Sequence, residues 1–222
     1  YTTVVIVFVS FIVALVAGSG VRVTVAVVVR GSGVCVAAGV CVGGTTAVFV
    51  AVGVFAGGVS LEGAESACTG GDIVEGEVLD LLSRLADQSL VVPEEGARGA
   101  ARYRLLESIR QYGWERLEES KELSATRDRH ASYFATLAAR AEGELEGPEQ
   151  VLWLDRLEEE YDNFRAAIQR ALETRNAECG LRLIAGLWRF WWIRGHLQDG
   201  RDRAQAVLAM SEGHEDIALR AH

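Results

Sequence analysis

Lysine is almost absent from this sequence. All but one of its 22 basic residues are arginines, the exception being Lys121. Residues 1–61 also lack aspartate and glutamate, and their only charged side chains are Arg22 and Arg30. The rest of the chain therefore holds 20 basic and 31 acidic residues. An acidic surface of this kind argues against a large contact with the phosphates of a nucleic acid.

Paired cysteines are also missing. Cys35, Cys41, Cys68 and Cys179 form no CxxC pair and have no histidine near them in the sequence. This spacing argues against a zinc site, so no metal ligands are predicted. We expect free thiols in a reducing compartment, which favours a cytoplasmic location.

No phosphate-binding loop is complete. Residues 39–46 have the glycine spacing of GxxxxGK[ST], but Thr45 stands where that motif has its lysine. The lysine supplies the positive charge that reaches the β- and γ-phosphates. We therefore expect a glycine-rich turn here. The sequence also shows no catalytic residues and no cofactor site, so the chain is not predicted to be an enzyme.

Residues 1–54 are predicted to be a separate apolar segment. Residues 1–17 are uncharged but shorter than the roughly 20 residues that a membrane helix needs. Valine-rich runs follow at 21–29, 34–42 and 47–54, and β-branched residues favour strands. Three interpretations remain open: a membrane anchor at residues 1–17, a set of buried strands, or a non-native reading frame of GC-rich DNA. The anchor would make the protein membrane-associated.

Residues 75–117 predict the order helix, strand, turn, strand, helix. Residues 89–92 are partly β-branched, and Pro93 ends that strand or lies at a sheet edge. Residues 94–100 are charged and glycine-containing, which is typical of a hairpin tip, and 102–105 alternate polar and apolar. The first helix has an apolar face made of Val78, Leu81, Leu82 and Leu85. This order predicts a small winged-helix module over residues 55–120.

The segment resembles the winged-helix part of bacterial STAND-type (AfsR/LuxR-like) regulators. The similarity is carried by FAGG at 55–58, SLEGAESAC at 60–68, EVLDLLSRLADQSLV at 77–91 and ARYRLLESIRQYGWERLEES at 101–120. It continues through the helical segments that follow, to the end of the chain. Members of this family are large nucleotide-switch ATPases, often with a helix-turn-helix output domain. The resemblance implies an ATPase domain before the winged helix, so ATP or ADP is expected only in that absent domain.

This sequence lacks one functional motif of that family. Many members carry a histidine in a Met-His-Asp-like triplet that senses the nucleotide phosphate. The matching positions read Leu105, Leu106 and Glu107, so the resemblance transfers no nucleotide-sensing residue.

Direct DNA binding by this module is not expected. In DNA readers the helix before the wing enters the major groove. Here residues 75–88 carry four carboxylates and a single basic residue, Arg84. DNA phosphates would repel these carboxylates. Arg98, Arg102 and Arg104 near the turn argue the other way. A packing or switch role is favoured.

Residues 124–222 are predicted to be a helical-repeat region. Ser124 is expected to cap a helix that ends near Leu145, with His130 as a hydrogen-bonded packing residue on its apolar stripe. A second, amphipathic helix is expected to run without a break from Pro148 to about Leu172. Its carboxylates at positions 158, 159, 160 and 162 are expected to form a solvated face.

The following helices, 177–194 and 197–210, are expected to pair around Gly195 as in a tetratricopeptide (TPR) repeat. Trp188, Trp191 and Trp192 are too many aromatic residues for one buried stripe. Some of them must face a neighbouring helix or a protein partner. Core packing is favoured, and the three tryptophans are the candidate protein-interaction residues.

These observations predict a mainly α protein with three parts: the apolar segment 1–54, the winged-helix module 55–120 and the TPR-like region 124–222. The predicted function is a non-catalytic central fragment of a nucleotide-switch transcriptional regulator, because the chain starts at Tyr1 and matches only part of that architecture. It would relay state between the absent ATPase domain and helical sensor repeats. Its partners would be other domains of the parent protein and a protein or ligand on the repeats. The alternative is a free-standing TPR-like scaffold, membrane-anchored if residues 1–17 are an anchor.

Overall fold

The computed structural model describes residues 25–30, 33–38, 44–68 and 75–211, with side chains from residue 47 onward except at 75 and 98. Predictions about residues 1–17 and 39–43 lie outside the described residues. The last residues of the glycine-rich turn predicted at 39–46 are not a turn, because α1 begins at Gly44. The described chain is mainly helical, as predicted. The helices are α1 (Gly44–Val52), α2 (Leu61–Cys68), α3 (Val78–Asp87), α4 (Glu107–Ser120), α5 (Leu123–Glu144), α6 (Gln150–Glu159), α7 (Tyr161–Thr174), α8 (Ala177–Arg194) and α9 (Leu197–Ser211). The strands are β1 (Val25–Arg30), β2 (Gly33–Ala38), β3 (Val59–Ser60), β4 (Val91–Glu95) and β5 (Ala101–Leu105).

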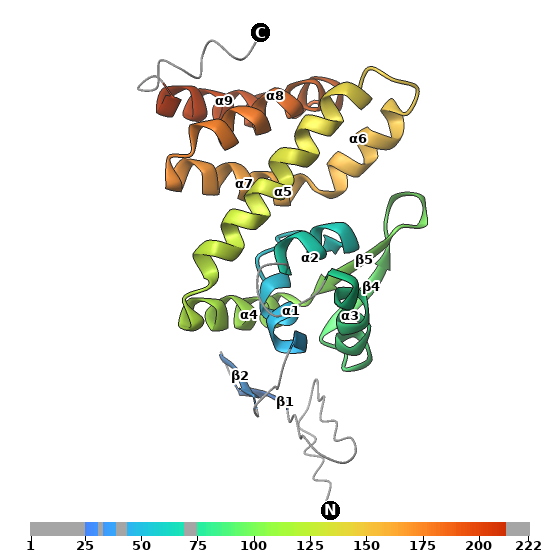
Figure 1. Ribbon diagram of the computed structural model, residues 1–222, viewed down its shortest axis with the longest axis vertical. Coiled ribbons are helices and arrows are strands. Elements are labelled where there is room, and N and C mark those ends of the chain that lie inside the picture. The colour runs from blue at the N-terminus through green and yellow to red at the C-terminus, as the bar shows by residue number, and fades with distance from the viewer. Residues whose placement is uncertain (1–24, 31–32, 39–43, 69–74, 212–222) are drawn as a thin grey trace, which may run out of the picture.

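The described part of residues 44–120 forms the sheet module, which Figure 1 shows below the helices α5 to α9 and above β1 and β2. Its elements follow in the order α1, β3, α2, α3, β4, β5, α4. β5 is the middle strand and pairs antiparallel with β3 on one side and β4 on the other. The predicted order helix, strand, turn, strand, helix for residues 75–117 is confirmed. The four apolar residues predicted on the face of α3 are all buried.

The hairpin differs from its prediction in one detail. β4 continues through Pro93 to Glu95, whereas the sequence predicted a strand over 89–92. Pro93 pairs with Tyr103 in the register of the sheet. The strand tolerates this proline because β4 is an edge strand and leaves half of its N–H groups outside the ladder. On β5, Tyr103 and Leu105 are buried and Arg104 is exposed, which confirms the predicted alternation.

Most of the valine-rich run 47–54 is helical and none of it is a strand, since α1 ends at Val52 and a turn follows. α1 contacts α2, α3 and α4, and Val48 and Val52 have no exposed surface. A helix that is apolar on all sides is stable when other elements surround it, and this is the position of α1. The predicted boundary between residues 54 and 55 therefore falls inside one packed unit, with α1 on its N-terminal side.

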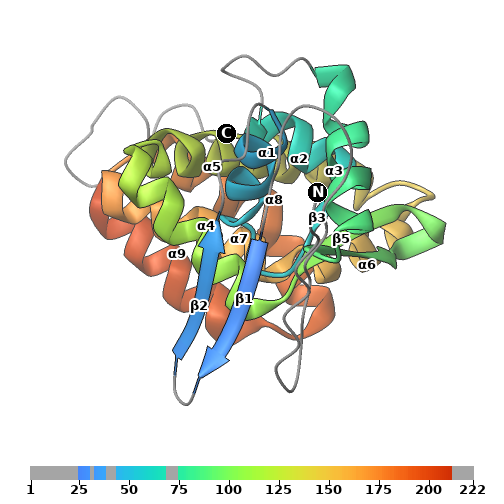
Figure 2. The ribbon, with the colours of Figure 1, turned by 90° about the horizontal axis from the view of Figure 1, so that it is seen from below.

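The two preceding valine-rich runs do form strands. β1 and β2 pair antiparallel, with Val25 opposite Ala38 and Arg30 opposite Gly33. Figure 2 shows them side by side as a two-stranded ribbon. Residues 25–30 and 33–38 are thus strands, in agreement with that part of the buried-strand interpretation, while the burial of their side chains lies outside the described part.

Residues 123–211 form the helical module. α5 packs against α7 and α8, and α8 packs against α9. α8 and α9 turn at Gly195, which has φ +85°, and this confirms the predicted helix pair. α5 crosses α8 at very short distance, because a Cβ atom added at Gly186 would lie 2.2 Å from the carbonyl oxygen of Ala138.

Three helix predictions for this module are wrong. α5 begins at Leu123 with no side-chain cap, so Ser124 lies inside the first turn, where its Oγ accepts a hydrogen bond from Arg170 at 2.6 Å. Pro148 lies in the turn before α6, which begins at Gln150. The expected unbroken helix is divided into α6 and α7 at Glu160, a residue with φ −93° and ψ 6°.

A short turn connects the two modules. α4 ends at Ser120, and the exposed Lys121 follows with φ 64°, in the left-handed conformation that closes a helix. Across the ranges that the structure describes, no helix combines the length and the apolar character needed to cross a membrane.

Candidate module junction and tryptophan face

A buried ion pair joins the two modules. Arg102 on β5 pairs with Glu160 at the α6–α7 break, and the two side chains are 11% and 4% exposed. The same guanidinium lies 3.8 Å from the carboxylate of Glu159 and donates to the carbonyl oxygens of Gly57 and Glu159 at 3.4 Å each. A buried charge is stable only when it is paired and hydrogen-bonded, and Arg102 meets both conditions.

Asn163 completes this arrangement. Its side chain is fully buried, and its Oδ1 accepts a hydrogen bond from the Ala56 N–H at 2.8 Å. Its Nδ2 donates to the Gly58 carbonyl at 2.9 Å and to Glu160 Oε2 at 2.7 Å. Gly58 has φ +94°, which favours glycine, so the chain turns sharply where Asn163 binds it. We call Arg102, Glu160 and Asn163 the junction.

A second, more exposed group of charges lies beside the junction. Glu62 of α2 accepts hydrogen bonds from Arg140 at 3.0 Å and from Arg156 at 2.7 Å. Both guanidinium groups also lie over the ring of Trp153, at 5.7 and 5.2 Å from its centroid. The Glu62 side chain is 50% exposed, so water screens these pairs and each contributes less than the buried one.

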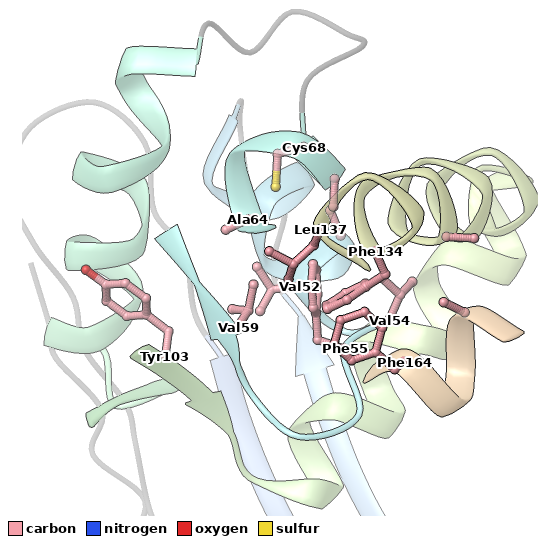
Figure 3. Close-up of a cluster of buried hydrophobic side chains, with 14 of the residues drawn as sticks. Val52, Val54, Phe55, Val59, Ala64, Cys68, Tyr103, Phe134, Leu137 and Phe164 are labelled. Carbon is pink, nitrogen blue, oxygen red and sulfur yellow. The ribbon is translucent and has the colours of Figure 1, made fainter. Parts of the chain in front are cut away.

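Aromatic rings fill the apolar space next to the junction. Phe55 stands edge-on to His130, with ring centroids 4.8 Å apart, and Phe134 packs on Phe164 at 5.0 Å. Figure 3 shows Phe55, Phe134 and Phe164 converging with Val52 and Val54. These rings come from both modules, so the modules share one hydrophobic core.

His130 lies inside this core. It is 3% exposed, as the packing interpretation requires. Its Nε2 has no hydrogen-bond partner in the described structure, but the ring has a side-chain hydrogen bond with Asn163, in agreement with the prediction of a bonded residue. Burial lowers the pKa of His130 to about 4, because the charged ring would lose its hydration. The ring is therefore neutral at pH 7 and acts as a packing group.

The junction is not predicted by the sequence pattern. The prediction of a solvated face for positions 158, 159, 160 and 162 is wrong at Glu160, which is buried. Arg102, predicted as a charge near the hairpin turn, is paired inside the protein. A signal was present in the spacing, because Glu160 stands three residues after Leu157 and four before Phe164, on the apolar stripe itself. A carboxylate on such a stripe requires a buried partner.

The three predicted interaction tryptophans divide into two groups. Trp188 and Trp192 are 50% and 68% exposed, so both are available at the surface. Trp191 is 4% exposed and faces inward, which removes it from the predicted interaction surface. It covers Gly200, where an added Cβ would lie 2.5 Å from its ring. Sequence spacing alone did not show which of the three faces the core.

Leucines of α9 extend the exposed surface. Leu197 and Leu208 are 52% and 51% exposed. We call Trp188, Trp192, Leu197 and Leu208 the tryptophan face. Its large apolar side chains suit contact with another protein surface better than contact with a charged ligand.

The described residues show neither a metal site nor a reactive cysteine. Within them no three His, Cys, Asp or Glu side chains are grouped as metal ligands. Burial raises the pKa of Cys68 to about 12 and also raises that of Cys179, so both thiols stay protonated and weakly nucleophilic at pH 7.

One hollow of about 200 Å³ lies between α5, α7 and α8. Its charged side chains pair with one another, Arg170 with Asp128 at 2.8 Å and Arg182 with Glu178 at 2.8 Å. This mutual pairing leaves no excess charge for a cofactor to neutralise.

No known protein-family profile matches the chain, and no solved structure matches it. Curated mycobacterial proteins do. One from Mycobacterium tuberculosis (strain ATCC 25618 / H37Rv), named provisionally as an HTH-type transcriptional regulator, is 34% identical over 177 residues, covering 78% of this chain and 20% of the relative. A protein of the same description from Mycobacterium bovis (strain ATCC BAA-935 / AF2122/97) has the same identity and coverage. An uncharacterized protein of the first strain is 40% identical over 88 residues, 39% of this chain and 22% of that protein.

The chain thus spans about a fifth of the length of the regulators that it matches. That these relatives are named as transcriptional regulators agrees with the kind of protein that the sequence resembles.

Proposed function

We propose that the chain is a non-catalytic central segment of a nucleotide-switch transcriptional regulator of the STAND type. It relays the state of an ATPase domain, located outside this chain, to helical sensor repeats. The mycobacterial relatives named as regulators support this role, since they match 78% of the chain. In this proposal ATP or ADP binds the other domain, because residues 39–46 lack the phosphate-loop lysine. The regulator works in the cytoplasm, where its thiols stay reduced.

In this proposal the sheet module is a winged helix that packs against other domains and does not read DNA. The order helix, strand, helix, helix, strand, strand supports the winged-helix assignment. Glu77 at the N-cap of α3 and Asp80 and Asp87 on its exposed side outnumber the single Arg84, so this surface would repel phosphates. Arg102 and Arg104 are already paired with Glu160 and Glu94, while the side chain of Arg98 lies outside the described part.

The junction is the main structural support for the proposed relay between the modules. A rigid connection requires polar bonds that hold both partners in one geometry, and buried bonds meet this requirement better than screened ones. Arg102 belongs to the sheet module, and Glu160 and Asn163 belong to the helical module. A rotation of the sheet module would therefore move α6 and α7 with it. The α8–α9 pair, proposed as the first TPR-like unit, stacks on this base.

The relay predicts one fixed distance between the modules. Spin labels at Ser83 on α3 and Gln205 on α9, both exposed, can be attached through genetically encoded ketone residues. Double electron–electron resonance should show a single narrow distance distribution. The double variant Arg102→Gln, Glu160→Gln should broaden it, and Arg104→Gln, which breaks an exposed pair within the sheet module, should not. A broad distribution in the unaltered chain would contradict a rigid relay.

The regulatory role has a separate test. In the M. tuberculosis relative, the 177 matched residues are replaced by those of this chain, and transcripts are compared with those of a strain lacking the regulator. We expect the chimera to reverse the transcript changes caused by the deletion. A chimera that accumulates at the normal level and restores none of them would contradict the proposed function.

The exposed tryptophans favour one alternative, a free-standing TPR-like scaffold that binds a protein partner. The same chimera separates the two proposals. A scaffold has no reason to restore regulated transcription inside an unrelated regulator, whereas an equivalent segment does.

A further inference from the structure

The hollow between α5, α7 and α8 has small apolar residues in its lining. Ala131, Ala135 and Ala171 line it and are buried. Longer aliphatic side chains at these positions would fill part of the space, because protein interiors leave few voids. The volume of the hollow is about 200 Å³, somewhat more than the roughly 150 Å³ of an apolar cavity that holds benzene. The hollow is therefore large enough for a molecule of about eight non-hydrogen atoms.

The charged residues of the lining balance one another. Asp128 of α5 and Glu178 of α8 are acidic, while Arg170 of α7 and Arg182 of α8 are basic. A ligand with a net charge would leave a like charge of the lining unbalanced beside it. A zwitterion avoids this cost, because it can contact one basic and one acidic side chain at the same time.

The first turns of α8 provide groups that suit a carboxylate. Asn176 is the N-cap of this helix, where the positive end of the helix dipole favours a negative charge. Its Oδ1 accepts a hydrogen bond from the Cys179 N–H at 3.0 Å, while its Nδ2 donates to no residue that the structure describes. Arg182 pairs with Glu178, but the two side chains are 64% and 66% exposed. Such an exposed pair contributes little, so the guanidinium can turn to a ligand at small cost.

The α5 side of the hollow provides acceptors that suit an ammonium group. Arg170, whose side chain is 12% exposed, holds Asp128 in place by donating from Nε to Oδ1 at 2.8 Å. Asp128 Oδ2 and the hydroxyl of Ser132, one turn further along α5, make no hydrogen bond within the described part of the chain. A carboxylate oxygen and a hydroxyl oxygen on the same helix face can both accept from one ammonium group.

We propose that this hollow binds a small zwitterion, an α-amino acid with a short aliphatic side chain such as L-valine. Its carboxylate contacts Arg182 and Asn176, and its ammonium group contacts Asp128 and Ser132. Its aliphatic side chain packs against the alanines of the lining. The role of this molecule as the ligand of the helical sensor repeats rests on the proposed function, whereas its binding is measured on this chain alone.

Isothermal titration calorimetry of the full chain with L-valine tests the site. A ligand of this size gains limited binding free energy, so we expect a dissociation constant of about 0.1–1 mM. Isovalerate and isobutylamine keep an aliphatic group, but the first lacks the ammonium group and the second lacks the carboxylate. Each should bind at least about tenfold more weakly than L-valine, because it leaves one set of charged partners unused.

Two variants and one control locate the binding. Arg182→Gln should weaken L-valine binding about tenfold, and Ser132→Phe should abolish it by filling the hollow. Both residues are exposed, so the variants should fold normally. The matched control is Arg116→Gln on α4, which breaks an exposed pair with Glu119 outside the hollow and should leave the dissociation constant unchanged.

Three outcomes would overturn the proposal. One is the absence of L-valine binding at concentrations up to about 10 mM. Another is equal binding of isovalerate or isobutylamine, which would mean that the site recognises a single charge. The third is unchanged binding in Ser132→Phe, which would place the ligand elsewhere on the chain. None of these results alters the transcript test of the chimera, so failure of this site and failure of the proposed function are told apart.

Discussion

At the scale of single residues, Glu160 has two roles that are hard to separate. Its backbone is the point at which α6 ends and α7 begins, and its carboxylate pairs with Arg102 of the other module. Asn163, one turn further on, binds the same carboxylate and both sides of the Gly57–Gly58 turn. Together they couple the direction of the chain to the contact between the modules.

Replacing Glu160 by Gln should destabilise the folded chain. The substitution leaves the buried Arg102 guanidinium with only the more distant and more exposed carboxylate of Glu159, so we expect a loss of about 3 kcal/mol in the free energy of unfolding. The control is Glu94→Gln, which breaks the pair with Arg104, and both of those side chains are more than 40% exposed. There the loss should stay below about 1 kcal/mol. Urea unfolding at pH 7 measures both, and equal losses would contradict a buried pair.

His130 should make stability depend on pH. Its pKa is lowered by burial from 6.5 to about 4, so the unfolded chain binds the proton more tightly than the folded one. The contribution is fully present above pH 6.5, and it is lost as pH falls toward 4, with a total of about 3 kcal/mol. Urea unfolding of His130→Leu between pH 4 and 7 should show a smaller slope than the unaltered chain. The same slope in both proteins would assign the dependence to other groups.

At the scale of elements, the spacing of apolar residues predicted much of the fold. It located α3, the β4–β5 hairpin and the α8–α9 pair, because each has an apolar face in contact with a core. It failed for α1, since a helix buried on all sides has no apolar and polar faces to compare. It failed at Glu160 because a break of one residue leaves the helical period of the neighbouring stripes intact. The junction could not be predicted, because 58 residues separate Arg102 from Glu160.

The crossing of α5 and α8 gives a prediction at this scale. Gly186→Val should destabilise the chain by about 3 kcal/mol or more, because the added Cβ would overlap the Ala138 backbone and force the helices apart. Gly143→Ala on α5 is the control, since nothing lies within 4 Å of that added Cβ. Because alanine favours a helix, this change should be neutral or stabilising by up to about 1 kcal/mol. Thermal unfolding followed by circular dichroism compares them, and similar losses in both variants would contradict the close crossing.

At the scale of the whole molecule, the modules should unfold together. They share one hydrophobic core as well as the junction, so opening one exposes apolar surface of the other. We expect one calorimetric transition for the unaltered chain, with the calorimetric enthalpy equal to the van't Hoff enthalpy. The double variant Arg102→Gln, Glu160→Gln should unfold at lower temperature and less cooperatively. Two separate transitions in the unaltered chain would mean that the modules are independent.

The single lysine has a practical consequence. Lys121 is exposed and lies in the turn between α4 and α5, at the boundary of the two modules. A protease specific for lysine therefore has one peptide bond to cut, and the cut yields one fragment for each module. The nicked protein would be held together only by non-covalent contacts, which include the junction, the ion pairs of Glu62 and the shared core. Gel filtration then shows whether the two fragments elute together or apart. This measures whether the contact between the modules is strong enough to hold them together, with no change to the amino-acid sequence.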